Sequence, residues 1–160
     1  MNRRAKRQLV AAVIMLAVAA AIFFNSWRAS QAGPQAFFYD LSKGELFTAD
    51  ANLIPPIRGV DNAEEDGVKA VVIAPTPDDK KNRRIAYLER FAPELKRDME
   101  EARARKTRPV IDRGSQQNFR FVRRAKDSNW YSMNSPEGQR IVNEWTTPGP
   151  DGISPVVCTP

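Results

Sequence analysis

Apolar residues along the chain form one long uninterrupted run near the N-terminus and short periodic segments after it. The run extends from Leu9 to Phe24 without a charged side chain, and a basic flank precedes it, made up of Arg3, Arg4, Lys6 and Arg7. As a helix, this run covers about 24 Å, and extension to Trp27 brings it close to the roughly 30 Å hydrocarbon core of a bilayer. The pattern predicts a membrane-spanning helix over residues 8–28.

That span predicts a topology, because a basic flank stays on the cytoplasmic side of the membrane. Residues 1–7 are then a cytoplasmic flank and 29–35 a spacer, followed by an exported domain over 36–146 and an irregular tail over 147–160. The predicted location is the bacterial inner membrane, with the C-terminal domain outside the cytoplasm. Two alternatives remain: a cleaved signal peptide and a buried helix of a soluble protein.

Beyond the spacer, the pattern changes to short segments typical of β-strands. Residues 36–40 and 45–49 flank a turn at 41–44, where Gly44 is suited to a positive φ, and they predict a β-hairpin. Residues 68–74 are almost continuously apolar and β-branched, as a central strand would be. These segments predict the first half of a sheet.

A further strand is predicted over residues 118–124, with residues 129–133 as its partner. Strand alternation assigns Phe119 and Phe121 to one face. It assigns the other face to Arg120, Val122 and Arg124. Arg123 therefore faces away from Arg120 and Arg124, so these arginines need not form one surface.

Helices are predicted where apolar residues recur at steps of three and four. One such stripe comprises Ile85, Leu88, Phe91, Leu95, Met99 and Ala102. Pro93 interrupts it, which predicts a short helix over 83–91 and a second helix starting at Pro93. A third helix is expected after Ser135 as its N-cap, held against the sheet by Trp145.

Together these elements predict an α+β fold, in which a membrane-spanning helix precedes a small, mostly antiparallel sheet with two or three helices on one face. A parallel sheet is the weaker alternative, because hairpin signals outnumber strand–helix–strand units. The expected core is aromatic and aliphatic: Phe37, Tyr39, Phe47, Val71, Ile73, Leu88, Phe91, Phe119, Phe121, Trp130 and Trp145.

The amino-acid composition excludes several kinds of catalytic and binding site. The chain contains no His and one Cys, so the sequence offers no Ser–His–Asp triad, no Cys–His pair and no intramolecular disulfide. It also lacks a glycine-rich phosphate loop and a Gly-x-Ser-x-Gly elbow. We therefore expect no cofactor, no metal site and no catalytic residue.

Positive charge is concentrated in one stretch of the sequence. Residues 103–126 hold nine basic residues and one acidic residue, whereas the whole segment 29–160 holds 20 basic and 19 acidic residues. The stretch is a candidate surface for an anionic ligand or a partner, formed by Arg120, Arg123, Arg124 and Lys126. Because the segment after the apolar run is nearly neutral overall, nucleic acid is not an expected partner.

Three segments support a loose resemblance: YDLSKGELF (39–47), YLERFAPELK (87–96) and NSPEGQRI (134–141). They resemble bacterial envelope proteins that have one N-terminal anchor, and this resemblance implies no activity and no functional residue. Pilin-like secretion subunits share the order of basic leader, apolar helix and exported head. Their specific Glu within the apolar run and Gly before it are both absent from this chain.

The resulting functional prediction is a non-catalytic, membrane-anchored envelope protein that binds or scaffolds another component. Its expected partners are the lipid bilayer, through residues 8–28, and an envelope protein. One alternative is a small envelope hydrolase that uses carboxylates or a Ser–Lys pair. Another is binding of an anionic polymer or lipid surface through residues 103–126.

Overall fold

The computed structural model describes residues 15, 17–20, 22–24, 33–61, 63–149 and 152–160. The chain divides into two compact units, and the larger one comprises Gln35–Pro160. This larger unit contains every strand in the described residues and carries the candidate site. It is an α+β domain built on an antiparallel sheet with a few helices, which confirms the coarse fold prediction.

The predicted membrane-spanning helix over residues 8–28 is corrected by the structure. In the described ranges no helix is long and apolar enough to cross a membrane, since a span needs roughly 20 consecutive apolar residues. Within 8–28, the structure describes residues 15, 17–20 and 22–24, and all of these are helical. The rest of that range, the flank over 1–7 and most of the spacer over 29–35 lie outside the described residues.

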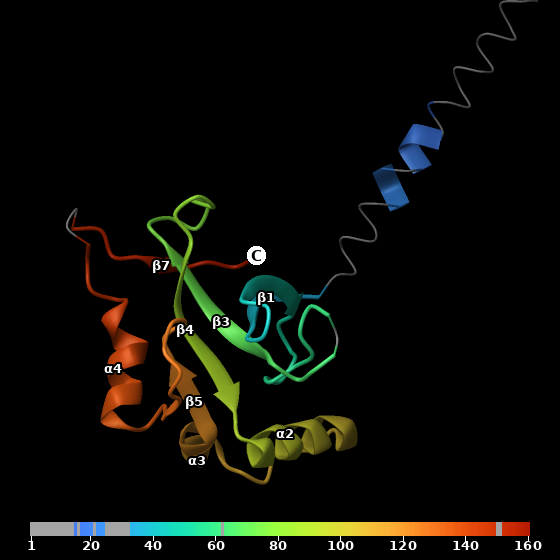
Figure 1. Ribbon diagram of the computed structural model, residues 1–160. Coiled ribbons are helices and arrows are strands. Elements are labelled where there is room, and N and C mark those ends of the chain that lie inside the picture. The colour runs from blue at the N-terminus through green and yellow to red at the C-terminus, as the bar shows by residue number, and fades with distance from the viewer. Residues whose placement is uncertain (1–14, 16, 21, 25–32, 62, 150–151) are drawn as a thin grey trace, which may run out of the picture. The chain divides into compact units, whose positions relative to one another are not determined.

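The sheet has the strand order β2-β1-β3-β4-β5-β6, so the connection from β2 to β3 passes β1, whereas β3 to β6 follow one another in chain order (Figure 1). Every neighbouring pair is antiparallel, so the parallel alternative is wrong. The strands are β1 (Gln35–Asp40), β2 (Glu45–Asp50), β3 (Gly67–Ala74), β4 (Arg84–Phe91), β5 (Arg120–Arg123) and β6 (Tyr131–Ser132). The predicted hairpin is confirmed as β1–β2, and Gly44 in its turn has a φ of 70°.

β3 is the central strand and pairs with three others. Its first half pairs with β1 at Lys69 and Val68, and its last two residues pair with β7 (Val156–Val157). The main-chain N–H of Cys158 extends this ladder by donating to the carbonyl of Val72 at 2.8 Å. The tail over 147–160, predicted to be irregular, therefore adds a short strand to the sheet.

The predicted helix over 83–91 is wrong, because these residues form β4. A β-bulge explains the misleading pattern. Val71 pairs with Tyr87 while Val72 pairs with Ile85, so Ala86 is an extra residue in the ladder. The bulge turns Ile85 to the same face as Leu88, three positions later, and both pack into one apolar cluster. A spacing of three on one face is also what a helix produces.

The helices follow the strands in chain order. They are α2 (Pro93–Arg105), α3 (Arg113–Gln116), the 3₁₀ turn η1 (Gln117–Phe119) and α4 (Pro136–Glu144). The predicted helix starts are confirmed, since Pro93 and Pro136 occupy the first turns of α2 and α4. Ser135 caps α4 by accepting a hydrogen bond from the Gly138 N–H at 3.1 Å. Figure 1 shows α2 at the end of the sheet where β4 ends.

The apolar core forms on both faces of the sheet. One cluster unites Phe37, Val68, Ala70, Val72, Ala74, Leu88 and Cys158. On the other face, Ile141 of α4 packs against Val122 of β5 and Met133. Ile141 is fully buried, so it anchors α4 in place of the predicted Trp145, which is only partly buried.

A buried carboxylate ties the β1–β2 turn to the loop that precedes β3. Asp40 is fully buried, and its Oδ1 accepts hydrogen bonds from the Ser42 N–H, the Ser42 hydroxyl and the Lys43 N–H at 2.8–3.0 Å. Its Oδ2 accepts from the Val60 N–H at 2.8 Å. The Lys43 bond is the main cause that lowers the pKa of Asp40 to about 2; the bonds from Val60 and Ser42 add to it against desolvation.

Gly138 allows α4 to lie directly against the chain that follows β6. A Cβ at this position would overlap the Ser132 carbonyl oxygen and lie 2.9 Å from the carbonyl carbon. In an ordinary helix, Gly→Ala stabilises by roughly 1 kcal/mol. We expect Gly138→Ala to destabilise by about 1–3 kcal/mol, because α4 must shift away from the sheet. Urea unfolding measures the change, and an unchanged or higher midpoint would contradict the close approach.

Asp40 predicts a specific dependence of stability on pH. Its pKa in the folded state lies below the ordinary value of 3.8, so its stabilisation is complete above about pH 4 and is lost as the pH falls through 2. Asp40→Asn should therefore lower the urea midpoint at pH 6 and have a shrinking effect toward pH 2. A difference between the two proteins that stays constant over this range would contradict the assignment.

Candidate functional site

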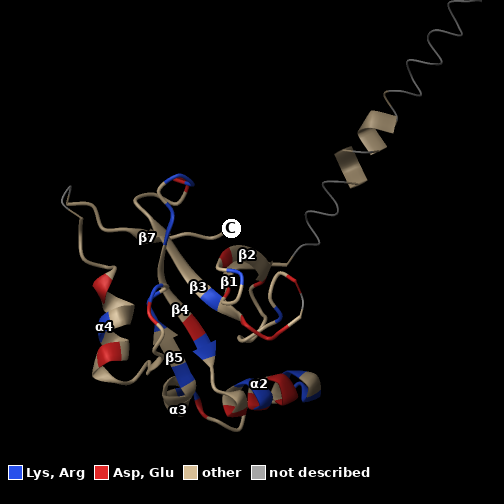
Figure 2. Cartoon of the chain, in the orientation of Figure 1, with Lys and Arg blue, Asp and Glu red and all other residues tan. Residues whose placement is uncertain are grey.

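The four residues of the predicted basic surface do not share one environment. Arg120 and Arg123 lie on β5 and point to opposite faces, as strand alternation predicts, since Arg123 pairs with Leu88 and Arg120 with Phe91. Arg124 and Lys126 follow in the loop after β5. Figure 2 shows basic segments on β4, on β5 and in the loop after β5, and acidic positions on α4. Each arginine therefore has to be judged by its own partners.

Arg120 is neutralised by a buried acid. Its Nε lies 2.5 Å from Oε1 of Glu89, whose side chain is only 5% exposed. The guanidinium also lies over the Phe91 ring, 5.6 Å from its centroid. Because the buried Glu89 carboxylate takes up this cation, Arg120 is a structural residue of the sheet and leaves no spare charge for a ligand.

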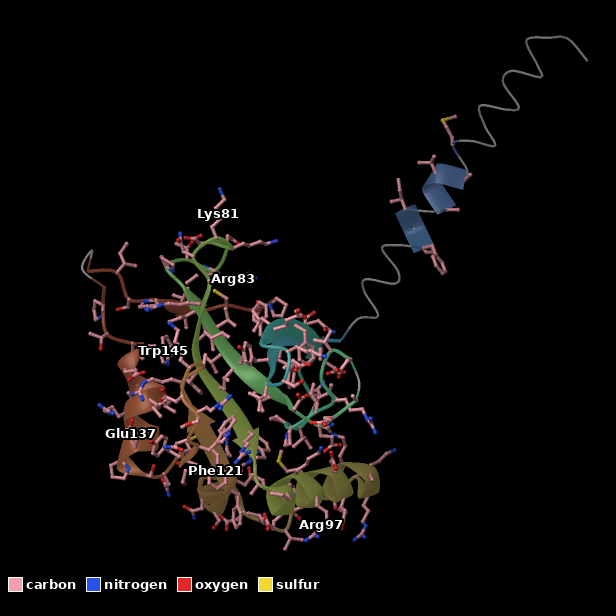
Figure 3. The ribbon with its side chains drawn as sticks, viewed as in Figure 1. Lys81, Arg83, Arg97, Phe121, Glu137 and Trp145 are labelled. Atoms are coloured by element: carbon pink, nitrogen blue, oxygen red, sulfur yellow. The ribbon has the colours of Figure 1, made fainter. Side chains whose placement is uncertain are left out.

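Arg124 is occupied by three carboxylates. Its Nε and Nη2 donate to the two oxygens of Glu144 at 2.7 and 2.6 Å, a bidentate pair that links the loop after β5 to the end of α4. Its Nη1 lies 3.2 Å from both Asp127 and Glu137. These bonds, led by Glu144, raise the pKa of Arg124. Arg124 therefore links α4 to the loop after β5. Figure 3 labels Glu137, one of its partners on that helix.

Arg123 belongs to a different arrangement, formed on the face opposite Glu89. Its guanidinium carbon lies over the Trp130 ring, 4.9 Å from the centroid. Arg90 of β4 lies over the same ring at 4.5 Å. Arg90 pairs in register with Phe121, and Arg123 with Leu88, so the two arginines are diagonal neighbours on adjacent strands. We call Arg90, Arg123 and Trp130 the Arg–Trp–Arg cluster.

The cluster holds two positive charges without a matching acid. Neither Arg90 nor Arg123 forms an ion pair with a carboxylate among residues 33–61, 63–149 and 152–160. Burial lowers the pKa of Arg90, and repulsion from Arg123 lowers it further. The indole offsets part of this cost, since a cation over an aromatic face gains about 0.5–2 kcal/mol. A bound anion would remove the remaining repulsion.

Stacking also leaves the arginine donors available. A guanidinium that uses its flat face on an aromatic ring keeps its N–H groups, which point outward in its plane. Arg123 donates from Nη1 to the carbonyl of Asp127 at 2.8 Å, and its buried Nε has no acceptor in the described part of the chain. The side chain of Arg90 donates no hydrogen bond to a described residue. The arrangement is suited to hold a carboxylate or phosphate group.

Sequence reasoning identified Arg123 but missed Arg90 and the role of Trp130. Arg90 lies in the segment 83–91, for which the sequence predicts a helix. A helical pattern does not show which face of the sheet Arg90 occupies in the strand β4. The signal that indicates a strand is the β-favouring content of Ile85, Tyr87 and Phe91. Trp130 lies in the partner segment predicted over 129–133. Its contact with Arg90 joins two positions that are far apart in the chain, and the spacing of residues along the sequence does not predict such a contact.

Other chemistry is limited within the described residues. They contain no group of three or more His, Cys, Asp or Glu side chains placed to hold a metal ion. Cys158 is a free thiol buried in the apolar cluster beneath the sheet. The last candidate residue, Lys126, is exposed in the loop after β5.

Comparison with known proteins adds no further assignment. No family model, no curated protein and no solved structure matches this chain.

The Glu89–Arg120 pair predicts the cost of removing one buried partner. Arg120→Met should destabilise the domain by about 3 kcal/mol, because the Glu89 carboxylate would remain buried without its cation. Lys126→Gln is the matched control, since it removes a positive charge from an exposed position and should change stability by about 0.5 kcal/mol or less. Equal effects in thermal or urea unfolding would show that the ion pair is not a structural requirement.

Proposed function

We propose that the domain is a non-catalytic binding module, and that the Arg–Trp–Arg cluster holds a carboxylate from an acidic segment of a partner protein. One observation carries the proposal: two arginines share the ring of Trp130 and have no acidic partner in the described residues. An uncompensated pair of this kind destabilises the free protein slightly. It becomes favourable when an anion accepts hydrogen bonds from both guanidinium groups.

A short acidic segment fits this surface better than a long anionic polymer. Affinity for a polyanion grows with the number of its charges that the protein neutralises. Arg105, Arg120 and Arg124 are paired with carboxylates, so the basic stretch offers fewer available cations than its composition indicates. The partly buried aromatic side chains of Phe121 and Trp130 lie beside the cations and provide apolar surface for residues that flank a carboxylate.

The test is binding of a hexaglutamate peptide to the full chain, followed by titration with the Arg90→Gln and Arg123→Gln variants. Each substitution should weaken binding by about tenfold or more, since a hydrogen bond to a charged group contributes about 1.5–3 kcal/mol. Binding should also weaken steeply between 0.1 M and 1 M salt, as the Debye length falls from about 10 Å to about 3 Å.

Arg97→Gln is the matched control. Arg97 is an exposed arginine of α2, labelled in Figure 3, and its replacement makes the same change in net charge at another surface. Loss of binding in this variant equal to that in Arg90→Gln would show attraction by overall charge alone and contradict the site. Inorganic polyphosphate is the second ligand, and tighter binding of polyphosphate than of the peptide would identify a polymer-binding surface instead.

A further inference from the structure

A separate pocket lies where β5 is shorter than its neighbour β4. β5 pairs with β4 only from Leu88 to Phe91, so the first residues of β4 extend past the end of β5. The loop after β5 turns away at this point, and the end of α4 closes the far side at Trp145. The pocket has a volume of about 610 Å³. Figure 3 shows Trp145 at the end of α4 nearest the start of β4.

Part of the lining of this pocket is apolar and lies at the β-bulge. Ile73 of β3 is 1% exposed and forms part of the base. Ile85 and the bulged residue Ala86 line it from β4, and Ala125 lines it from the loop after β5. A bulge re-aims side chains locally, and bulges are common beside binding sites. This part of the pocket fits a compact apolar group.

Positive charge surrounds the apolar part. Arg84 and Lys126 are exposed lining residues, and neither forms an ion pair with a carboxylate in the described ranges. The acids in the lining, Asp127 and Glu144, are both engaged by Arg124. The two available cations therefore favour an anionic head group, while the apolar lining favours an uncharged body.

Trp145 adds a polar group that lacks a partner. Its indole Nε1 is buried and donates to no acceptor in the described residues. Buried indole N–H groups ordinarily have an acceptor, so an unpaired one calls for an explanation. An acceptor that enters the pocket lined by this ring would satisfy the donor.

We propose that this pocket binds a small organic carboxylate, with its apolar body over Ile73 and Ala86. The carboxylate lies between Arg84 and Lys126 and accepts a hydrogen bond from the indole of Trp145. This site is independent of the Arg–Trp–Arg cluster, because it uses a different set of residues.

The experiment uses the full chain labelled with ¹⁵N and titrated with octanoate. The indole N–H signal of Trp145, assigned by its absence in Trp145→Phe, should shift in a saturable manner as the acceptor binds. 1-Octanol supplies the apolar body without charge and acetate supplies the charge without the body. Both should bind at least tenfold more weakly than octanoate. An unmoved Trp145 signal, or octanol binding as tightly as octanoate, would overturn the proposal.

Two substitutions then locate the head group. Arg84→Gln and Lys126→Gln change exposed residues, so both variants should fold, and each should weaken octanoate binding by about tenfold. Arg97→Gln on α2 and Arg90→Gln in the cluster should leave it unchanged. Equal loss in all four variants would overturn the site, and the Arg90→Gln result separates failure of this pocket from failure of the proposed partner surface.

Discussion

The ladder between β3 and β4 is the constraint on which the rest of the structure depends. β3 is buried along most of its length and receives β1 and β7 on one side and β4 on the other. The bulge at Ala86 then sets which side chains of β4 point to each face. Leu88 packs in the apolar cluster, and Arg90 lies on the same face, over Trp130. Glu89 points to the other face, where it pairs with Arg120. Both the core and the candidate cluster follow from this one register.

The same bulge explains how much of the fold could be predicted from the sequence. The hairpin over 35–50, the central strand and the start of α4 have strong local signals, namely alternation, β-branched content and a Ser-Pro cap. β4 has a misleading one, because a bulged strand places Ile85 and Leu88 on one face at the spacing of a helix. The contacts of Trp130 with Arg90, and of β7 with β3, depend on tertiary packing and have no local signal.

The contacts of each arginine depend on its position in the fold, and not on the number of basic residues around it in the sequence. Arg120, Arg123 and Arg124 are close together in sequence, yet one meets a buried glutamate, one meets an indole and one meets three carboxylates. Strand alternation places Arg120 and Arg123 on opposite faces. Arg124 follows the end of β5, and its side chain reaches the carboxylates of α4. A dense run of basic residues is therefore compatible with a surface on which part of the positive charge is already bound by the protein's own carboxylates.

The alternation of Glu89 and Arg90 also limits how this sequence can change over evolutionary time. Insertion or deletion of one codon between the bulge and Leu88 would exchange the faces of these two residues. It would bring a carboxylate toward Trp130 and bury an arginine opposite Arg120. Insertions or deletions of two residues leave the side chains that follow on their present faces. Length variation between Tyr87 and Phe91 should therefore be tolerated only in even steps, whereas the loop over 75–83 is free of this restriction.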